Sequence, residues 1–149
     1  MNSVKKVKYA LATVAMLSAG VATAAPQVTV SFTNNTAEVA TYQPGSSRNE
    51  TTTYANASPK PSDVESGGSR SYIVSATASS PITYAMVTYT SGSKSCRFTT
   101  SYLTISTPGG VRTPKWNKSA VASGGARCDI RITSVDYSNH HWSVNLIMR

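Results

Sequence analysis

The sequence predicts an all-β fold: a single antiparallel β-sandwich, Ig-like or lysin-like, that is closed by one disulfide. Three observations indicate this class. Short runs alternate apolar and polar residues, as half-buried strands do. Thr, Tyr, Val and Ile, which favour pleated surfaces, are abundant. Seven Pro and nine Gly interrupt the chain, and no 3.6-residue apolar period follows the N-terminal segment.

The first 24 residues predict a secretory signal peptide. A start with three lysines is followed by an apolar run and by an A-x-A cleavage site at 22–24. We expect cleavage after Ala24 and a location in the periplasm or outside the cell. The alternative is a membrane anchor, but the run is shorter than a ~20-residue span and no stop-transfer charges follow it. Residues 25–149 then form one domain, long enough to bury a core.

The rest of the chain divides into alternating runs and turn-rich stretches. The predicted strands are 27–32, 37–42, 69–77, 82–90, 96–106, 127–135 and 140–148. Both faces of 82–90 are mostly apolar, which suits a central strand. A short polar turn joins 69–77 to 82–90, and another joins 127–135 to 140–148, so each pair predicts a hairpin.

Two polar stretches remain between these runs. Residues 43–68 are long for a connection in a compact domain, so they form a functional surface loop or contain an edge strand near 51–56, which we favour slightly. Residues 107–126 hold two prolines and two Gly-Gly pairs, which predict a second long loop.

Cys96 and Cys128 predict a disulfide. They are the two cysteines of a chain that we expect to be exported, and each lies on the apolar face of a predicted strand. Free thiols or a catalytic cysteine are the alternatives, but neither residue lies in a C-x-x-C motif. The bridge should therefore join neighbouring or facing strands in the core.

We expect no enzymatic activity, no cofactor and no metal. His140 and His141 are adjacent, so on a strand they would point to opposite faces and could not easily share one ion. No G-x-S-x-G, HExxH or phosphate-loop motif occurs. A small secreted enzyme with an unrecognised site remains an alternative.

Positive charge is concentrated in the C-terminal half. After residue 24 the chain has eleven basic and six acidic residues, a net charge of +5. Residues 25–90 have a net charge of −1, and residues 91–149 have +6. The excess serves solubility alone, or it attracts an anionic surface such as lipid headgroups, acidic polysaccharide or nucleic acid. We expect no specific nucleic acid partner.

The segment GGVRTPKWNKS suggests where such a surface would bind. Arg112, Lys115 and Lys118 surround Trp116 in the predicted loop, and an exposed Trp beside cations suits a membrane interface or a sugar ring. In the competing interpretation, Trp116 covers an open edge of the sandwich and the lysines are solvated. The predicted surface-binding residues are Arg112, Lys115, Trp116 and Lys118, with Arg97, Arg127 and Arg131 extending the patch on an outward strand face.

The sequence therefore predicts a secreted or periplasmic binding module that contacts an anionic lipid or polysaccharide surface. The plan is similar to that of small secreted β-sandwich proteins that engage membranes, such as aegerolysins and actinoporin-like lysins, although no motif matches them. The runner-up is a structural, fimbrial-type subunit that self-assembles when the strand QVTVSF pairs with another copy.

Overall fold

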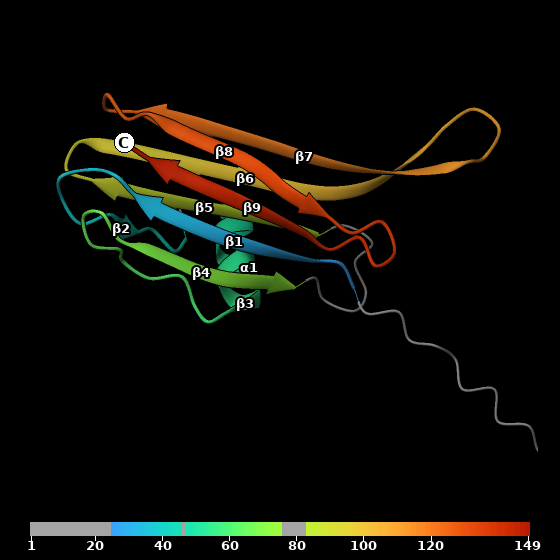
Figure 1. Cartoon of the computed structure of the whole chain (residues 1–149), viewed down its shortest axis with the longest axis horizontal. Coiled ribbons are helices and arrows are strands. Elements are labelled where there is room, and N and C mark those ends of the chain that lie inside the picture. Colours follow the sequence, from blue (N-terminus) through green and yellow to red (C-terminus); the bar gives the residue numbers. More distant parts are fainter. Residues whose placement is uncertain (1–24, 46, 76–82) are drawn as a thin grey trace, which may run out of the picture.

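In the computed structural model, residues 25–45, 47–75 and 83–149 are described, and they build two β-sheets (Figure 1). The sheets have the strand orders β3-β4-β1-β9-β8 and β2-β5-β6-β7. The elements are β1 (Gln27–Asn34), β2 (Thr41–Tyr42), α1 (Arg48–Asn56), β3 (Ala57–Ser58), β4 (Ser69–Ser75), β5 (Thr83–Ser91), β6 (Lys94–Ser106), β7 (Arg112–Ser123), β8 (Cys128–Val135) and β9 (Trp142–Met148). The expected signal peptide lies outside the described residues, within which no helix is long and apolar enough to cross a bilayer.

The two sheets share one apolar core. Alternation in β1 directs Val28, Val30 and Phe32 inward, and each is at most 1% exposed. The Phe32 ring stacks on Tyr89 of β5 in the other sheet, with 3.7 Å between ring centroids. The predicted inward faces of β1 and β9 are confirmed, because their inward side chains are buried in the core. The predicted inward residues of β8, Cys128, Ile130 and Ile132, are partly buried and pack against the same core.

One strand pair is parallel, contrary to the purely antiparallel prediction. β1 lies between β4, with which it pairs antiparallel, and β9, with which it pairs parallel. The period-2 pattern is the same for both directions, so the sequence carries no signal for this choice. β1 and β9 are also far apart in the chain, so no tight turn imposes an antiparallel pairing.

The hairpin predicted from 69–77 and 82–90 is wrong. The first run forms β4 in the five-stranded sheet, and the second forms β5 in the four-stranded sheet. The strands place their apolar faces on the shared core, Tyr72 and Val74 from one side and Val87 and Tyr89 from the other. A short connection in the sequence does not show whether the two strands that it joins pair in one sheet or lie in different sheets.

The edge strand expected near 51–56 is also wrong, because these residues form most of helix α1. Ser47 is the N-cap, and its hydroxyl accepts a hydrogen bond from the Glu50 N–H at 3.3 Å. The helix packs against β5, where the Thr53 hydroxyl accepts from the Met86 N–H at 2.9 Å. Only the short β3 follows, as an edge strand.

The long loop predicted at 107–126 contains a strand instead. β7 pairs with β6 from Ser106↔Arg112 to Ser95↔Ser123 and forms the edge of the four-stranded sheet. The Gly-Gly pairs mark separate turns at its two ends, and Gly109, with φ of 100°, requires the freedom of glycine. Pro114 is tolerated because an edge strand has one side without partners.

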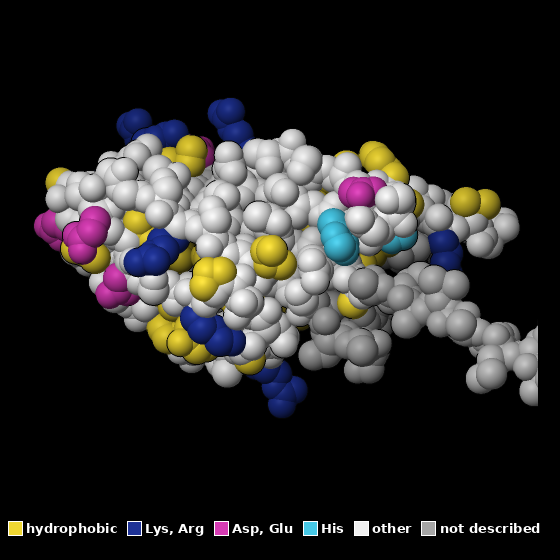
Figure 2. Space-filling model, turned by 60° about the horizontal axis from the view of Figure 1, so that its bottom comes forward, with side chains coloured by type: hydrophobic (Ala, Val, Ile, Leu, Met, Phe, Trp, Pro, Cys, Tyr) yellow, Lys and Arg dark blue, Asp and Glu magenta, His cyan; other side chains and the backbone are white. Residues whose placement is uncertain are grey.

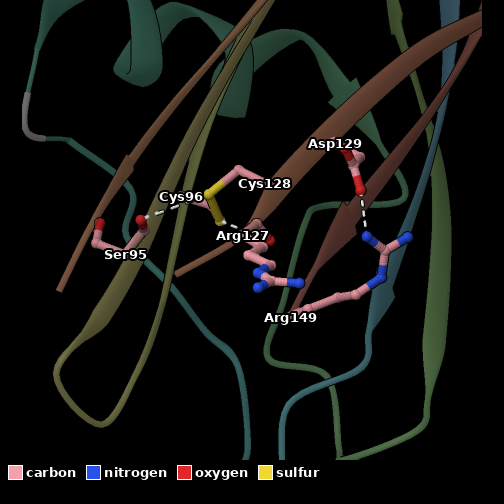
Figure 3. Close-up of a disulfide and its surroundings, with 6 residues drawn as sticks. All are labelled: Ser95, Cys96, Arg127, Cys128, Asp129 and Arg149. Carbon is pink, nitrogen blue, oxygen red and sulfur yellow. Dashed lines mark hydrogen bonds and ion pairs between the residues drawn. A yellow bond between two sulfur atoms is a disulfide. The ribbon is translucent and has the colours of Figure 1, made fainter. Parts of the chain in front are cut away.

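The disulfide is confirmed, and it joins the two sheets. Cys96 of β6 is bonded to Cys128 of β8, with the two Cα atoms 5.6 Å apart (Figure 3). The same corner holds a contact between the Arg149 guanidinium and the Asp129 carboxylate. A disulfide is compatible with an extracellular or periplasmic location.

Removing the disulfide should lower the free energy of unfolding by about 3–4 kcal/mol, because the bridge restricts the unfolded chain over a 32-residue separation. Urea unfolding of residues 25–149 with Cys96→Ser and Cys128→Ser together measures this loss. The Ser71→Ala variant, at an exposed position of β4, is the control. Equal urea midpoints for the double variant and the wild type would contradict the prediction.

Candidate surface-binding site

The most prominent surface feature is a two-stranded arm, residues 103–115, which we call the β6–β7 arm. β5 pairs with β6 only as far as Thr83↔Tyr102. Among the described residues, β6 beyond this pair is bonded only to β7, from Leu103↔Lys115 to Ser106↔Arg112. The arm consequently projects past the other strands of both sheets (Figure 1).

A cluster of rings, the aromatic base, lies where the arm leaves the sheet. It consists of Tyr102, Trp116, Tyr137, His140 and Trp142. Trp116 lies opposite Tyr102 in the strand register, with ring centroids 5.4 Å apart, and its other neighbour is Tyr137 at 5.2 Å. His140 stacks on Tyr102 at 4.9 Å.

Trp116 is half-buried in this base. Its indole N–H donates to the backbone carbonyl of His140, with an N···O distance of 3.4 Å, and its ring packs against the core. The residue thus covers the open side of the two sheets, as in the competing interpretation of the sequence. It can present only part of its ring to a ligand.

Two of the predicted cations lie on the arm itself. Arg112 and Lys115 are both exposed and, by strand alternation, point to opposite faces. Lys118 lies two residues after Trp116 on β7, and its Nζ donates a hydrogen bond to the Ile130 carbonyl of β8 at 3.0 Å. Lys118 therefore bridges the two edge strands, which limits its availability to a ligand.

The other three predicted cations lie elsewhere. Arg97 is on the outer face of the four-stranded sheet, where its Nε is 3.6 Å from Oε1 of Glu50. Arg131 is on the outer face of the five-stranded sheet, and Arg127 is beside the disulfide at the end opposite the arm. Figure 2 shows Lys and Arg spread over one face of the molecule. The seven predicted residues do not form one patch.

Two exposed aliphatic side chains on the arm escaped the sequence analysis. Val111 at the tip is 63% exposed and Ile105 is 38% exposed. The sequence feature that could have revealed these side chains is the uncharged segment 103–111, which immediately precedes Arg112. The whole sequence between Glu65 and Asp129 also lacks an acidic residue.

One carboxylate lies at this end of the molecule. Asp136, in the turn between β8 and β9, accepts hydrogen bonds from the hydroxyl and the N–H of Ser138. These bonds hold the pKa of Asp136 below its usual value. The residue therefore carries a negative charge near neutral pH.

The described residues offer limited material for catalysis or metal binding. An open depression of about 470 Å³ is lined by residues that include Tyr42, Tyr54, Asp63 and Arg70, and Asp63 is its one carboxylate. The Asp63 Oδ1 accepts from the Tyr42 N–H at 2.8 Å. Within the described ranges, no three His, Cys, Asp or Glu side chains gather as a metal site requires.

Comparison with known proteins supplies no further guide. The sequence matches no family model and no curated protein. The function must therefore be argued from the arrangement of the residues themselves.

Proposed function

We propose that the chain is a secreted or periplasmic binding module without enzymatic activity, and that the end carrying the β6–β7 arm contacts an anionic surface. In this proposal the two sheets form a single β-sandwich, which their shared core and the disulfide between them support. The rigid sandwich holds the arm, and the arm presents the charge.

The observation that carries the proposal is that the two cations on the arm are exposed and have no ion-pair partner among the described residues. Arg112 and Lys115 are exposed, and neither forms an ion pair within the residues that the structure describes. Cations without protein partners keep their full attraction for an external anion. Arg97, in contrast, already lies beside the buried Glu50.

Replacing Arg112 and Lys115 together by Ala should weaken binding to an anionic surface roughly 30-fold, since each cation near a lipid surface contributes about 1 kcal/mol. Co-sedimentation of residues 25–149 with phosphatidylglycerol vesicles, and separately with an acidic polysaccharide, measures this across salt concentrations. Wild-type binding should fall with salt, because exposed charges are screened over ~8 Å at physiological ionic strength.

The matched control replaces Arg127 and Arg131 by Ala. This variant loses the same charge at positions away from the arm, so it should bind much more tightly than the Arg112→Ala/Lys115→Ala variant. Equal weakening in both variants would show that net charge, not the arm, governs binding. No binding to either probe at low salt would refute the proposed function.

A further inference from the structure

The tip of the β6–β7 arm combines exposed apolar side chains with hydrogen bonds inside its turn. Val111 is 63% exposed and Ile105 is 38% exposed, and no charged residue occurs from 103 to 111. Inside the turn, the Thr107 N–H donates to the Val111 carbonyl at 2.9 Å and the Gly110 N–H donates to the Thr107 carbonyl at 3.1 Å. The Thr107 hydroxyl also donates to the Val111 carbonyl, at 3.0 Å.

This combination suits a medium that is poor in water. Moving exposed valine and isoleucine side chains out of water is favourable, because it removes apolar surface from water. The hydrogen bonds inside the turn reduce the cost of moving its backbone out of water as well. A hydrated polysaccharide offers no apolar medium to an aliphatic tip. A sugar ring would instead favour a free aromatic face, whereas Trp116 is packed against Tyr102 and Tyr137.

The arm is also long enough to reach through a headgroup layer. Ser106 and Arg112 lie four residues beyond Tyr102 and Trp116, which is roughly 14 Å at ~3.4 Å per residue. The polar layer on each side of a bilayer is about 5–8 Å thick. The tip can thus reach the acyl chains while the aromatic base stays near the interface, where Trp and Tyr are favoured.

We propose that the anionic surface is a phospholipid bilayer and that the tip of the arm, with Val111 foremost, enters the boundary between headgroups and acyl chains. This inference rests on the proposed function. Arg112 and Lys115 lie behind the tip, at the level of the phosphates, and the long side chain of Arg112 can extend back to them. Binding then has a salt-sensitive part from the cations and a salt-resistant part from the tip.

The first test replaces Val111 by Asn, which removes apolar surface without changing charge. Binding to vesicles of phosphatidylglycerol and phosphatidylcholine should weaken about tenfold, and the loss should persist at high salt. Val111→Leu should bind like the wild type. Val121→Asn is the matched control, because Val121 is 61% exposed but lies on β7 away from the tip. Equal binding by Val111→Asn and the wild type would overturn the inference.

The second test measures depth. The fluorescence of a Val111→Trp variant, after subtraction of the wild-type signal, should be quenched by lipids brominated on their acyl chains. The same measurement on Val121→Trp should show little quenching. No quenching at position 111 would overturn insertion.

Other outcomes separate this inference from the proposed function. Salt-sensitive vesicle binding without quenching, or binding to acidic polysaccharide but not to vesicles, would overturn the inference and leave the proposed function standing. Absence of binding to both probes would reject the two together.

Discussion

The free energy of unfolding is expected to fall steeply as the pH rises from 10 towards 12, because three buried tyrosines must stay neutral in the folded state. Burial raises the pKa of Tyr89 to about 12 and raises the pKa values of Tyr42 and Tyr72 above their ordinary value of 10. All three side chains are at most 6% exposed. A phenolate at any of these positions would lose its hydration.

The direction in which pH changes the free energy of unfolding depends on whether the folded or the unfolded state releases protons. Below pH 10 the tyrosines are neutral in both states, so their contribution to stability is complete. Between pH 10 and the folded pKa, the unfolded chain ionises while the folded chain does not. Each tyrosine then costs about 1.4 kcal/mol per pH unit, so Tyr89 alone accounts for roughly 2.7 kcal/mol at pH 12, and the three together for about 4 kcal/mol per pH unit.

A titration followed by tyrosinate absorbance and by far-ultraviolet circular dichroism measures this effect. The buried tyrosines should ionise together with the loss of β-structure. Tyr89→Phe keeps a ring that can stack on Phe32 and should make the pH slope shallower by about 1.4 kcal/mol per unit. Ionisation of Tyr42, Tyr72 and Tyr89 near pH 10 with the fold intact would contradict the prediction.

The sequence was most informative where one face of a strand is buried and the other is not. β1 and β9 alternate strictly because the core accepts every second side chain, so their inward residues could be read from the pattern. The disulfide could be predicted because the chain has two cysteines and each lies on the apolar face of a predicted strand. The pattern could not supply the direction of β1 relative to β9 or the sheet to which β5 belongs, since both depend on contacts between distant segments.

β7 and α1 were missed because their environments give no apolar period. Most of β7 is exposed, as expected for the outer strand of a sheet, so alternation is weak and its terminal glycines resemble a loop. In α1 the buried residues are Glu50 and Thr53, which are polar, so the helix shows no apolar stripe. The spacing of Ser47 and Glu50 is nevertheless the S-x-x-E signature of a helix start.

The candidate site was partly accessible from the sequence. Arg112, Lys115 and Trp116 are close in the chain, so their proximity in space was foreseeable. Alternation correctly predicted that Arg97 and Arg131 are exposed, but the two residues lie in different sheets. The aromatic base depends on Tyr102 of β6 and on Tyr137 and His140 of the turn between β8 and β9, and only the fold brings them to Trp116.

Replacing Glu50 by Ala should lower the free energy of unfolding by about 3 kcal/mol, because this carboxylate holds helix α1 on the four-stranded sheet. Its side chain is fully buried, it accepts a hydrogen bond from the Thr88 hydroxyl, and its Oε1 is 3.6 Å from the Nε of Arg97. The Ser47 hydroxyl also donates to Oε2 at 3.3 Å. The substitution by alanine removes all of these contacts at once and leaves a cavity where the carboxylate was.

Graded variants separate the charge from the contacts. Glu50→Gln keeps the volume and an acceptor for Thr88 but loses the attraction to Arg97, so we expect a loss of about 1 kcal/mol. Glu65→Ala, at an exposed carboxylate, should stay within about 0.5 kcal/mol of the wild type. Urea unfolding of the three variants measures the series. If Glu50→Ala unfolded at the wild-type urea midpoint, Glu50 would not be what anchors α1, and the helix would be held by the Thr53–Met86 contact instead.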